Sequence, residues 1–145
     1  MRLIGEGGFA TVYLAHDTVL ERQVAIKELA TTLLRDESVI GRFIAEGKAA
    51  MLLRHPNIVE VCDVFREGDD YYIVMEYLPG GSLQDRLHAE GRLSVDEALA
   101  IMGELCAGLG HAHRKRVVHC DVKPATSHTV AVLARFRIRL APSGG

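Results

Sequence analysis

The residues best suited to chemistry in this sequence lie in one short segment, His119 to Pro124. Within it, Asp121 carries a carboxylate that is able to accept a proton from a substrate hydroxyl group. Lys123, two residues later, carries an ammonium group that would neutralise charge on a phosphoryl group during its transfer. An ordinary loop with an incidental Asp and Lys is the alternative interpretation. The segment by itself leaves phosphoryl transfer and a plain loop both open.

A glycine-rich segment near the start of the chain, Gly5 to Val12, approximates the pattern G-x-G-x-x-G-x-V, with Ala10 in place of the third glycine. Glycines let the backbone approach phosphate groups closely and present its N–H groups to them. A plain glycine-rich hairpin is the alternative. A dinucleotide-binding fingerprint requires a helix directly after the glycines. The alternating strand pattern that follows here excludes it.

A lysine in the apolar stretch Val24 to Leu29 is a second unusual feature, because burying an unmatched charge is costly. Nucleotide phosphates and a nearby carboxylate would both match the charge of Lys27. Glu46 is a candidate partner, because it shares a predicted helix face with Phe43 and Ala50. The alternatives are a lysine whose ammonium group reaches water along its aliphatic stem, and a solvent-exposed helix glutamate.

The segment from Met75 to Gly81 ends a predicted strand and opens a flexible linker at its Pro-Gly-Gly sequence. Exposed backbone groups of Glu76 and Leu78 are placed to pair with the edge of an adenine ring. An ordinary strand-to-loop junction is the alternative here.

These residues must be positioned by an alternation of strands and helices that predicts an α+β fold. The predicted strands are Arg2 to Ile4, Phe9 to Ala15, Gln23 to Leu29, Ile58 to Phe65 and Tyr71 to Tyr77, and the predicted helices are Ser38 to Arg54, Ser82 to Gly91 and Ser94 to Arg114. A capping box from Ser94 to Glu97 marks the start of the last helix. Gly47 inside the first helix is a local weakness that costs about 1 kcal/mol relative to alanine.

Composition bears on three properties of the protein: nucleic-acid binding, disulfide formation and membrane insertion. The chain has 145 residues and a net charge of -2, which does not suggest the basic face of a nucleic-acid-binding protein. Cys62, Cys106 and Cys120 show no paired spacing, so we expect reduced thiols in an intracellular protein. We find no signal-peptide pattern and no apolar run long enough to span a bilayer. We therefore expect a cytoplasmic location and no membrane segment in this chain.

Taken together, these motifs occur in the order and spacing of the protein kinase signature set, from Gly5 to Pro124. Arg54 to Val59 and Gly80 to Leu83 add to the match. The chain therefore resembles the protein kinase family, in particular the bacterial serine/threonine kinases of eukaryotic type. The resemblance implies a kinase N-terminal lobe over residues 1–78, with a five-stranded antiparallel sheet and one main helix. It further implies the hinge, the first C-terminal-lobe helices and the catalytic loop over residues 79–124, with the rest of that lobe missing.

The resemblance also implies ATP as the cofactor, a protein substrate with Ser or Thr, and a role for each matching residue. Asp121 would be the catalytic base, assisted by Lys123, and Lys27 would hold the α- and β-phosphates while paired with Glu46. Met75 would be the gatekeeper beside the adenine. The residues expected at the nucleotide are Ile4, Gly5, Glu6, Gly7, Gly8, Phe9, Ala10, Val12, Ala25, Lys27, Met75, Glu76 and Leu78.

The sequence departs from the family pattern where Mg²⁺ should bind. Thr126 stands where the family has a metal-binding Asn, and no Asp-Phe-Gly occurs anywhere in the chain. Acidic residues are also absent after Asp121. We therefore expect a truncated or frame-shifted kinase domain without metal ligands and with little or no catalytic activity, residues 125–145 being a divergent tail. In such a fragment Leu105 and Leu109 should be exposed.

Two other classes stay open for the chain. One is a pseudokinase-like module that binds a nucleotide or a protein without catalysis. The other is a product that does not fold stably.

Overall fold

A computed structural model describes residues 1–126 and 139–140, and all structural statements below concern these residues. The chain divides into two compact units. The first contains Met1–Leu52 and Glu60–Tyr77. The second contains Leu53–Val59 and the described residues from Leu78 onward. Each unit is described by itself.

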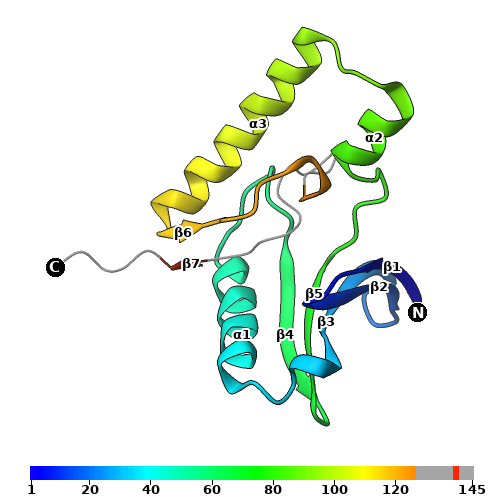
Figure 1. Cartoon of the computed structure of the whole chain (residues 1–145), viewed down its shortest axis with the longest axis vertical. Helices are drawn as coiled ribbons and strands as arrows, with labels where there is room; N and C mark the ends of the chain where they lie inside the picture. The colour runs from blue at the N-terminus through cyan, green and yellow to red at the C-terminus, as the bar shows by residue number, and fades with distance from the viewer. Residues whose placement is uncertain (127–138, 141–145) are drawn as a thin grey trace, which may run out of the picture. The chain divides into compact units, whose positions relative to one another are not determined.

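The first unit is built on a five-stranded antiparallel sheet with the strand order β1-β2-β3-β5-β4 (Figure 1). Its strands are β1 (Arg2–Glu6), β2 (Ala10–Asp17), β3 (Arg22–Leu29), β4 (Val61–Glu67) and β5 (Asp70–Glu76). The predicted α+β class and the five-stranded antiparallel sheet are confirmed. The largest difference in a strand boundary is at β4, which begins at Val61 and not at Ile58.

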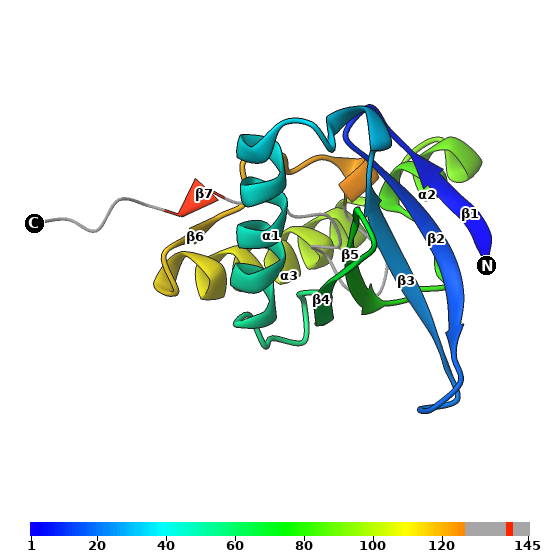
Figure 2. The ribbon, with the colours of Figure 1, turned by 90° about the horizontal axis from the view of Figure 1, so that it is seen from below.

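Helix α1 (Glu37–Met51) lies beside β4 and β5 in the same unit (Figure 2). The carboxylate of Asp36 caps it by accepting hydrogen bonds from the backbone N–H groups of Ser38 and Val39. A short 3-10 turn, η1 (Thr31–Leu33), leads into it. The glycine that weakens this helix has a packing reason, since a Cβ atom at Gly47 would lie 2.6 Å from Val64 Cγ2. The glycine thus permits a close approach of α1 to the sheet.

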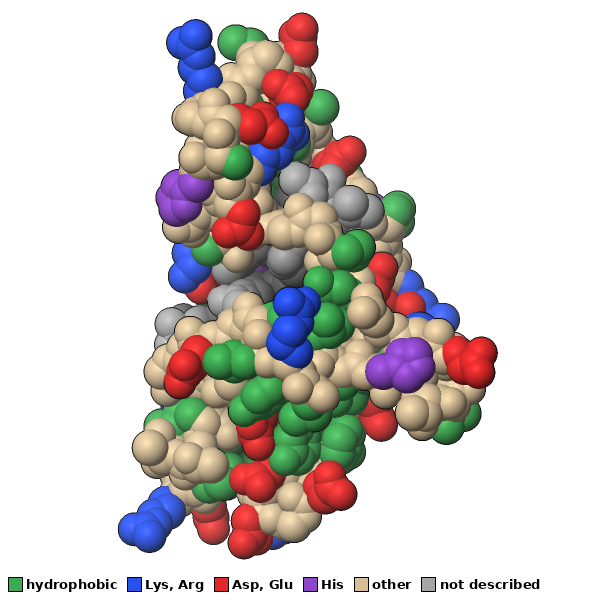
Figure 3. Space-filling view, turned by 90° about the vertical axis from the view of Figure 1, so that its right-hand side faces the viewer, with side chains coloured by type: hydrophobic (Ala, Val, Ile, Leu, Met, Phe, Trp, Pro, Cys, Tyr) green, Lys and Arg blue, Asp and Glu red, His purple; other side chains and the backbone are tan. Residues whose placement is uncertain are grey.

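The core of the first unit lies between α1 and the sheet. Leu29 at the end of β3 and Phe43 on α1 have no exposed surface, at 0% each. Hydrophobic side chains are not confined to this core, because Leu3 and Ile4 of β1 are exposed. Figure 3 shows hydrophobic side chains gathered over the lower part of the molecule, where the sheet of the first unit lies.

The second unit contains two helices, α2 (Leu83–Glu90) and α3 (Val95–Arg114). It also contains the short strands β6 (Val117–Val118) and β7 (Arg139–Leu140), which pair antiparallel, and the 3-10 turn η2 (Pro124–Thr126). The predicted capping box of Ser94 and Glu97 is confirmed, with each side chain bonded to the other residue's backbone N–H. Arg86 of α2 joins the two helices through an ion pair with Glu97.

The segment Leu53–Val59 belongs to this second unit, although the chain on either side of it belongs to the first. Asn57 Nδ2 donates a hydrogen bond to the backbone oxygen of Glu104 on α3, at 3.0 Å. The rings of His55 and His111 lie 5.2 Å apart between their centroids. Ile58 and Val59, whose apolar side chains predict a strand in the sequence, are buried and belong to this second unit.

The His55–His111 pair predicts that the stability of the second unit depends on pH. The pKa of His111 lies below its ordinary value of 6.5, because burial disfavours its charged form and because His55, Arg114 and Lys115 lie near it. The folded state therefore binds this proton less readily than the unfolded chain. The free energy of unfolding of the second unit should therefore fall as the pH drops below about 6.5.

Urea unfolding of the wild type and of His111→Gln between pH 7.5 and 5.5 measures this effect. The wild type should lose stability relative to the variant as the pH falls. His113→Gln, which changes an exposed histidine on the same helix, is the matched control. A stability difference between the wild type and His111→Gln that stays constant over this range would contradict the prediction.

The expected exposure of Leu105 and Leu109 was wrong in detail. Both are half-buried on α3. The large hydrophobic residues of this helix that are exposed are Val95, Leu99 and Met102. These five residues follow each other at spacings of three or four, so they lie on one side of α3, and the N-terminal part of this stripe is exposed while the later part is half-buried. The segment Leu53–Val59 contacts the later part of the helix, through the Asn57–Glu104 hydrogen bond and the His55–His111 ring pair.

No helix within the described part of the chain is long and apolar enough to cross a membrane. Cys62, Cys106 and Cys120 are free thiols. Most of the predicted divergent tail, residues 127–138 and 141–145, lies outside the described residues.

Candidate functional site

The glycine segment links β1 to β2 in the first unit. The backbone N–H of Gly7 donates to the backbone oxygen of Ala10 at 3.1 Å, which forms a tight turn. Neither Gly7 nor Gly8 has a positive φ angle, and a Cβ atom at Gly8 would meet no atom within 4 Å. Neither backbone conformation nor packing among the described residues therefore requires glycine at these positions. Close approach of a ligand to the backbone would require it.

Lys27 and Glu46 form an ion pair across the first unit. Lys27 comes from β3, which lies between β2 and β5, and its Nζ is 3.0 Å from Glu46 Oε1 on α1. The two side chains are only 18% and 12% exposed. A lysine that is this well buried needs a partner, and Glu46 provides one. The pairing expected from the sequence is therefore present, while the catalytic role of the two residues stays a prediction.

The side chains expected around the adenine share one face of the sheet. Val12 pairs with Lys27, and Ala25 pairs with Met75, so these four residues project to the same side of neighbouring strands. Ala25 is buried, Val12 and Met75 are half-buried, and Ile4 of β1 is 38% exposed. The structure thus places Val12, Ala25 and Met75 on the face that carries Lys27.

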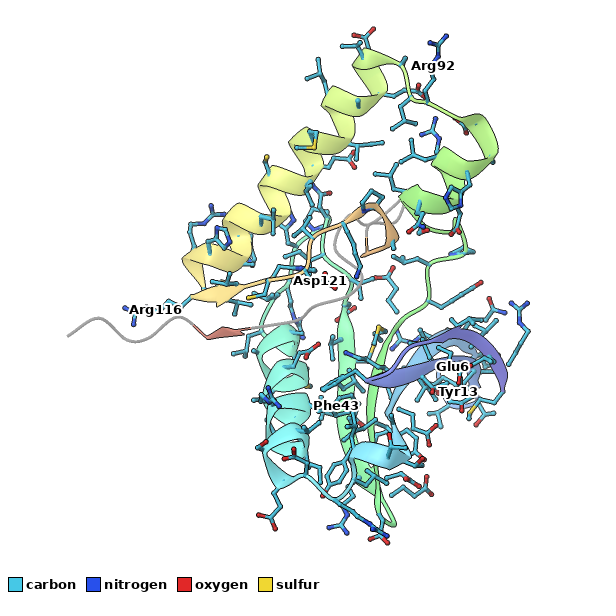
Figure 4. The ribbon with its side chains drawn as sticks, in the orientation of Figure 1. Glu6, Tyr13, Phe43, Arg92, Arg116 and Asp121 are labelled. Carbon is cyan, nitrogen blue, oxygen red and sulfur yellow. The ribbon has the colours of Figure 1, made fainter. Side chains whose placement is uncertain are left out.

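Glu6 lies on the opposite face. It pairs with Thr11, one residue out of phase with Val12. The pKa of Tyr13 is raised, mainly by burial of the phenol and by its hydrogen bond with Glu28, and to a smaller extent by the charge of Glu6. Figure 4 shows Glu6 and Tyr13 close together. Only the backbone of Glu6 therefore stays a candidate for nucleotide contact.

One backbone group at the strand end after Met75 is already engaged, and contact of Glu76 and Leu78 with an adenine ring stays a prediction. The backbone N–H of Glu76 donates to the backbone oxygen of Glu60 at 2.9 Å, so it is already engaged within the first unit. Leu78 is buried, at 9% exposed, and belongs to the second unit. The N–H of Glu76 is therefore not available to an adenine ring in this arrangement.

Asp121 and Lys123 lie in the second unit, in the segment between β6 and η2 (Figure 4). Lys123 Nζ is 3.0 Å from Asp121 Oδ2, and the two side chains are 53% and 42% exposed. The backbone N–H of Asp121 donates to Nδ1 of the buried His119 at 3.3 Å. His119 thus helps to fix the segment from which the carboxylate projects.

The described residues do not form a ready metal site. No group of three or more His, Cys, Asp or Glu side chains within them is placed to hold a metal ion. Mg²⁺ prefers carboxylate and other oxygen ligands. The loss of the family's metal ligands, with Thr126 in place of the expected Asn, stays a prediction from the sequence.

Comparison with known proteins decides the family. The sequence profile of the protein kinase domain matches residues 1–126. The chain belongs to the protein kinase family.

Its relatives include the serine/threonine-protein kinase PrkC of Bacillus subtilis, which is 47% identical over 124 residues. That match covers 86% of this chain and 19% of PrkC. The serine/threonine-protein kinase PknB of Mycobacterium leprae is 40% identical over 127 residues, which cover 85% of this chain and 20% of PknB. The chain spans about a fifth of the length of these curated relatives. The resemblance inferred from the sequence motifs is therefore confirmed.

Membership of the kinase family relates the two units to its architecture. The sheet and α1 of the first unit are consistent with the N-terminal lobe of a kinase, and α2 and α3 with the first helices of its C-terminal lobe. Protein kinases in general use ATP and Mg²⁺. The predicted N-terminal lobe, residues 1–78, contains the first unit together with the segment Leu53–Val59 and Leu78, which belong to the second unit.

The sequence motifs missed one aromatic residue at this site. Phe43 marks the core-facing stripe of α1 in the sequence, and nothing in its spacing indicates more. In the structure its ring lies 5.5 Å from Lys27 Nζ. Its position three residues before Glu46 on the same helix face is the only signal that could have suggested it.

Proposed function

We propose that this chain is the nucleotide-binding part of a serine/threonine protein kinase and that it binds ATP through its first unit. The glycine segment would cover the phosphates, and Lys27 would hold the α- and β-phosphates. Val12, Ala25 and Met75 would pack against the adenine. The observation that carries the proposal is the shielded Lys27–Glu46 ion pair, which holds an ammonium group on the same sheet face as these three side chains.

We propose that Asp121 and Lys123 of the second unit are the residues that take part in phosphoryl transfer. The carboxylate of Asp121 would accept the proton of a substrate Ser or Thr hydroxyl, and Lys123 would neutralise charge on the transferred phosphoryl group. The protein substrate with Ser or Thr follows from the names of the relatives. The similarity to serine/threonine-protein kinases and the presence of Lys123 two residues after Asp121 support the serine/threonine type.

A second candidate is a nucleotide-binding module without catalysis. Thr126 at the metal-binding position and the absence of Asp-Phe-Gly from the sequence favour it. The two candidates share the same nucleotide site and differ only in turnover. A cytoplasmic location stays a prediction under either of them.

A thermal-shift titration with ATP, with and without Mg²⁺, tests nucleotide binding. ATP at about 100 times its dissociation constant should add about 2.7 kcal/mol to the free energy of unfolding. We expect most of this stabilisation without Mg²⁺. An ATP titration that leaves the transition unmoved would refute the nucleotide site.

A phosphate-transfer assay with radiolabelled ATP and a mixture of Ser- and Thr-containing peptides separates the two candidates. Transfer of label to a peptide by the wild type, and its loss in Asp121→Asn, would favour the kinase. A chain that binds ATP but transfers no label would favour the module without catalysis.

A further inference from the structure

Phe43 joins three parts of the first unit that lie far apart in the sequence. Its side chain on α1 is 0% exposed, and it is among the largest fully buried side chains of the described residues. Figure 4 labels it on the side of α1 that faces the strands. Its ring lies 5.5 Å from Lys27 Nζ, and its centroid lies 6.4 Å from that of Phe9. One ring thus contacts both Lys27 and Phe9 of the glycine segment.

The Phe43 ring restricts the side chain of Lys27 in addition to the ion pair with Glu46. A lysine ammonium group within about 6 Å of a ring centroid is attracted by the negative face of the ring. Glu46 Oε1 already holds the same Nζ at 3.0 Å. With the carboxylate and the ring both in place, the long Lys27 side chain has few other arrangements. The Lys27 side chain therefore loses less conformational entropy when phosphates bind.

The contact with Phe9 restricts the glycine segment. The two rings are tilted by 44° at a separation within the range that aromatic pairs favour. The backbone oxygen of Phe9 also accepts a hydrogen bond from Ala30 N–H, at 3.1 Å. Because Gly7 and Gly8 have no side chains, Phe9 is the residue through which this turn is attached to α1.

We propose that Phe43 is a positioning residue of the nucleotide site. Its ring holds the Lys27 ammonium group and, through Phe9, the glycine segment in the arrangement that nucleotide phosphates require. It acts through these two residues and does not itself contact the nucleotide. The inference rests on the proposed function and assigns to the site a residue that the kinase motifs do not contain.

Phe43→Leu separates the chemistry of the ring from the burial of the side chain. Leucine keeps an apolar side chain in the core but has no aromatic face for Lys27 or Phe9. Val39→Ala is the matched control, because Val39 is buried on the same helix one turn earlier, at 6% exposed. It should lower stability without removing the ring. Phe43→Met serves the same comparison if the leucine variant does not fold.

The readout is the affinity of the full chain for ATP and for adenosine, measured by calorimetry. Because Phe43 acts on the phosphate-binding groups, Phe43→Leu should weaken ATP binding about tenfold, from the combined size of one cation–π and one aromatic contact. Adenosine binding should change less than about twofold, since adenosine has no phosphates for Lys27 to hold. Val39→Ala should bind both ligands as the wild type does.

Hydrogen exchange at the amides of residues 7–10 without nucleotide gives a second readout. Exchange there should be faster in Phe43→Leu than in Val39→Ala. Unchanged ATP affinity in Phe43→Leu, or equal losses for ATP and adenosine, would overturn the positioning role alone. A wild type that binds neither ligand would overturn the proposed function itself, and with it the role of Phe43 at the site.

Discussion

Replacing Lys27 with methionine should abolish the stabilisation of the chain by ATP. Lys27 carries the ammonium group that Glu46 and Phe43 hold on the sheet face proposed for the nucleotide. Methionine keeps most of the length of the side chain and removes its charge. If ATP affinity falls 100-fold, the same ATP concentration that stabilises the wild type by about 2.7 kcal/mol adds less than about 0.5 kcal/mol to the variant.

The measurement is the ATP-induced shift in melting temperature, compared within each variant. The variant without ligand should itself be less stable, because Glu46 loses its partner while only 12% exposed. Lys48→Met is the matched control, since it makes the same change at an exposed position on α1, the helix that carries Glu46. It should keep the full ATP response. An ATP-induced shift in melting temperature as large in Lys27→Met as in the wild type would contradict the role of Lys27.

Leu29→Ala should destabilise the first unit by about 2–5 kcal/mol. Leu29 ends β3 with no exposed surface, so removing its side chain leaves a cavity. The total stability of a small domain is only about 5–15 kcal/mol, so this change removes a large part of it. Urea unfolding followed by circular dichroism gives the change in free energy.

Leu20→Ala provides the control for this cavity. Leu20 lies in the turn between β2 and β3 and is 60% exposed, so its removal should change stability by less than about 0.5 kcal/mol. The two variants make the same chemical change within ten residues of chain. Equal effects would mean that burial at Leu29 is not what stabilises the unit.

Local patterns in the sequence predicted most elements of the fold because their causes are local. The capping box of Ser94 and Glu97 fixed the start of α3, since both partners lie within one helical turn. Strand alternation similarly located β2, β3 and β5. The start of α1 was missed by one residue, because Asp36 and not a later residue caps it.

Burial alone could not assign Ile58 and Val59. Their apolar side chains suit a strand of the sheet, and the sequence pattern places them there. In the structure they belong to the second unit, whose helix α3 accepts a hydrogen bond from Asn57. An apolar residue shows that something covers it, but its pattern does not say which element does so.

The sequence by itself determined the residue types and the order of the motifs, and with them the kinase family. The tertiary structure alone decided which side chains meet. Lys27 and Glu46 are separated by 19 residues, and Phe43 meets both Phe9 and Lys27 from a different element. Such contacts depend on the register of β2 and β3 and on the rotation of α1 above the sheet. Both are set by packing across the whole unit and not by the residues adjacent in the chain.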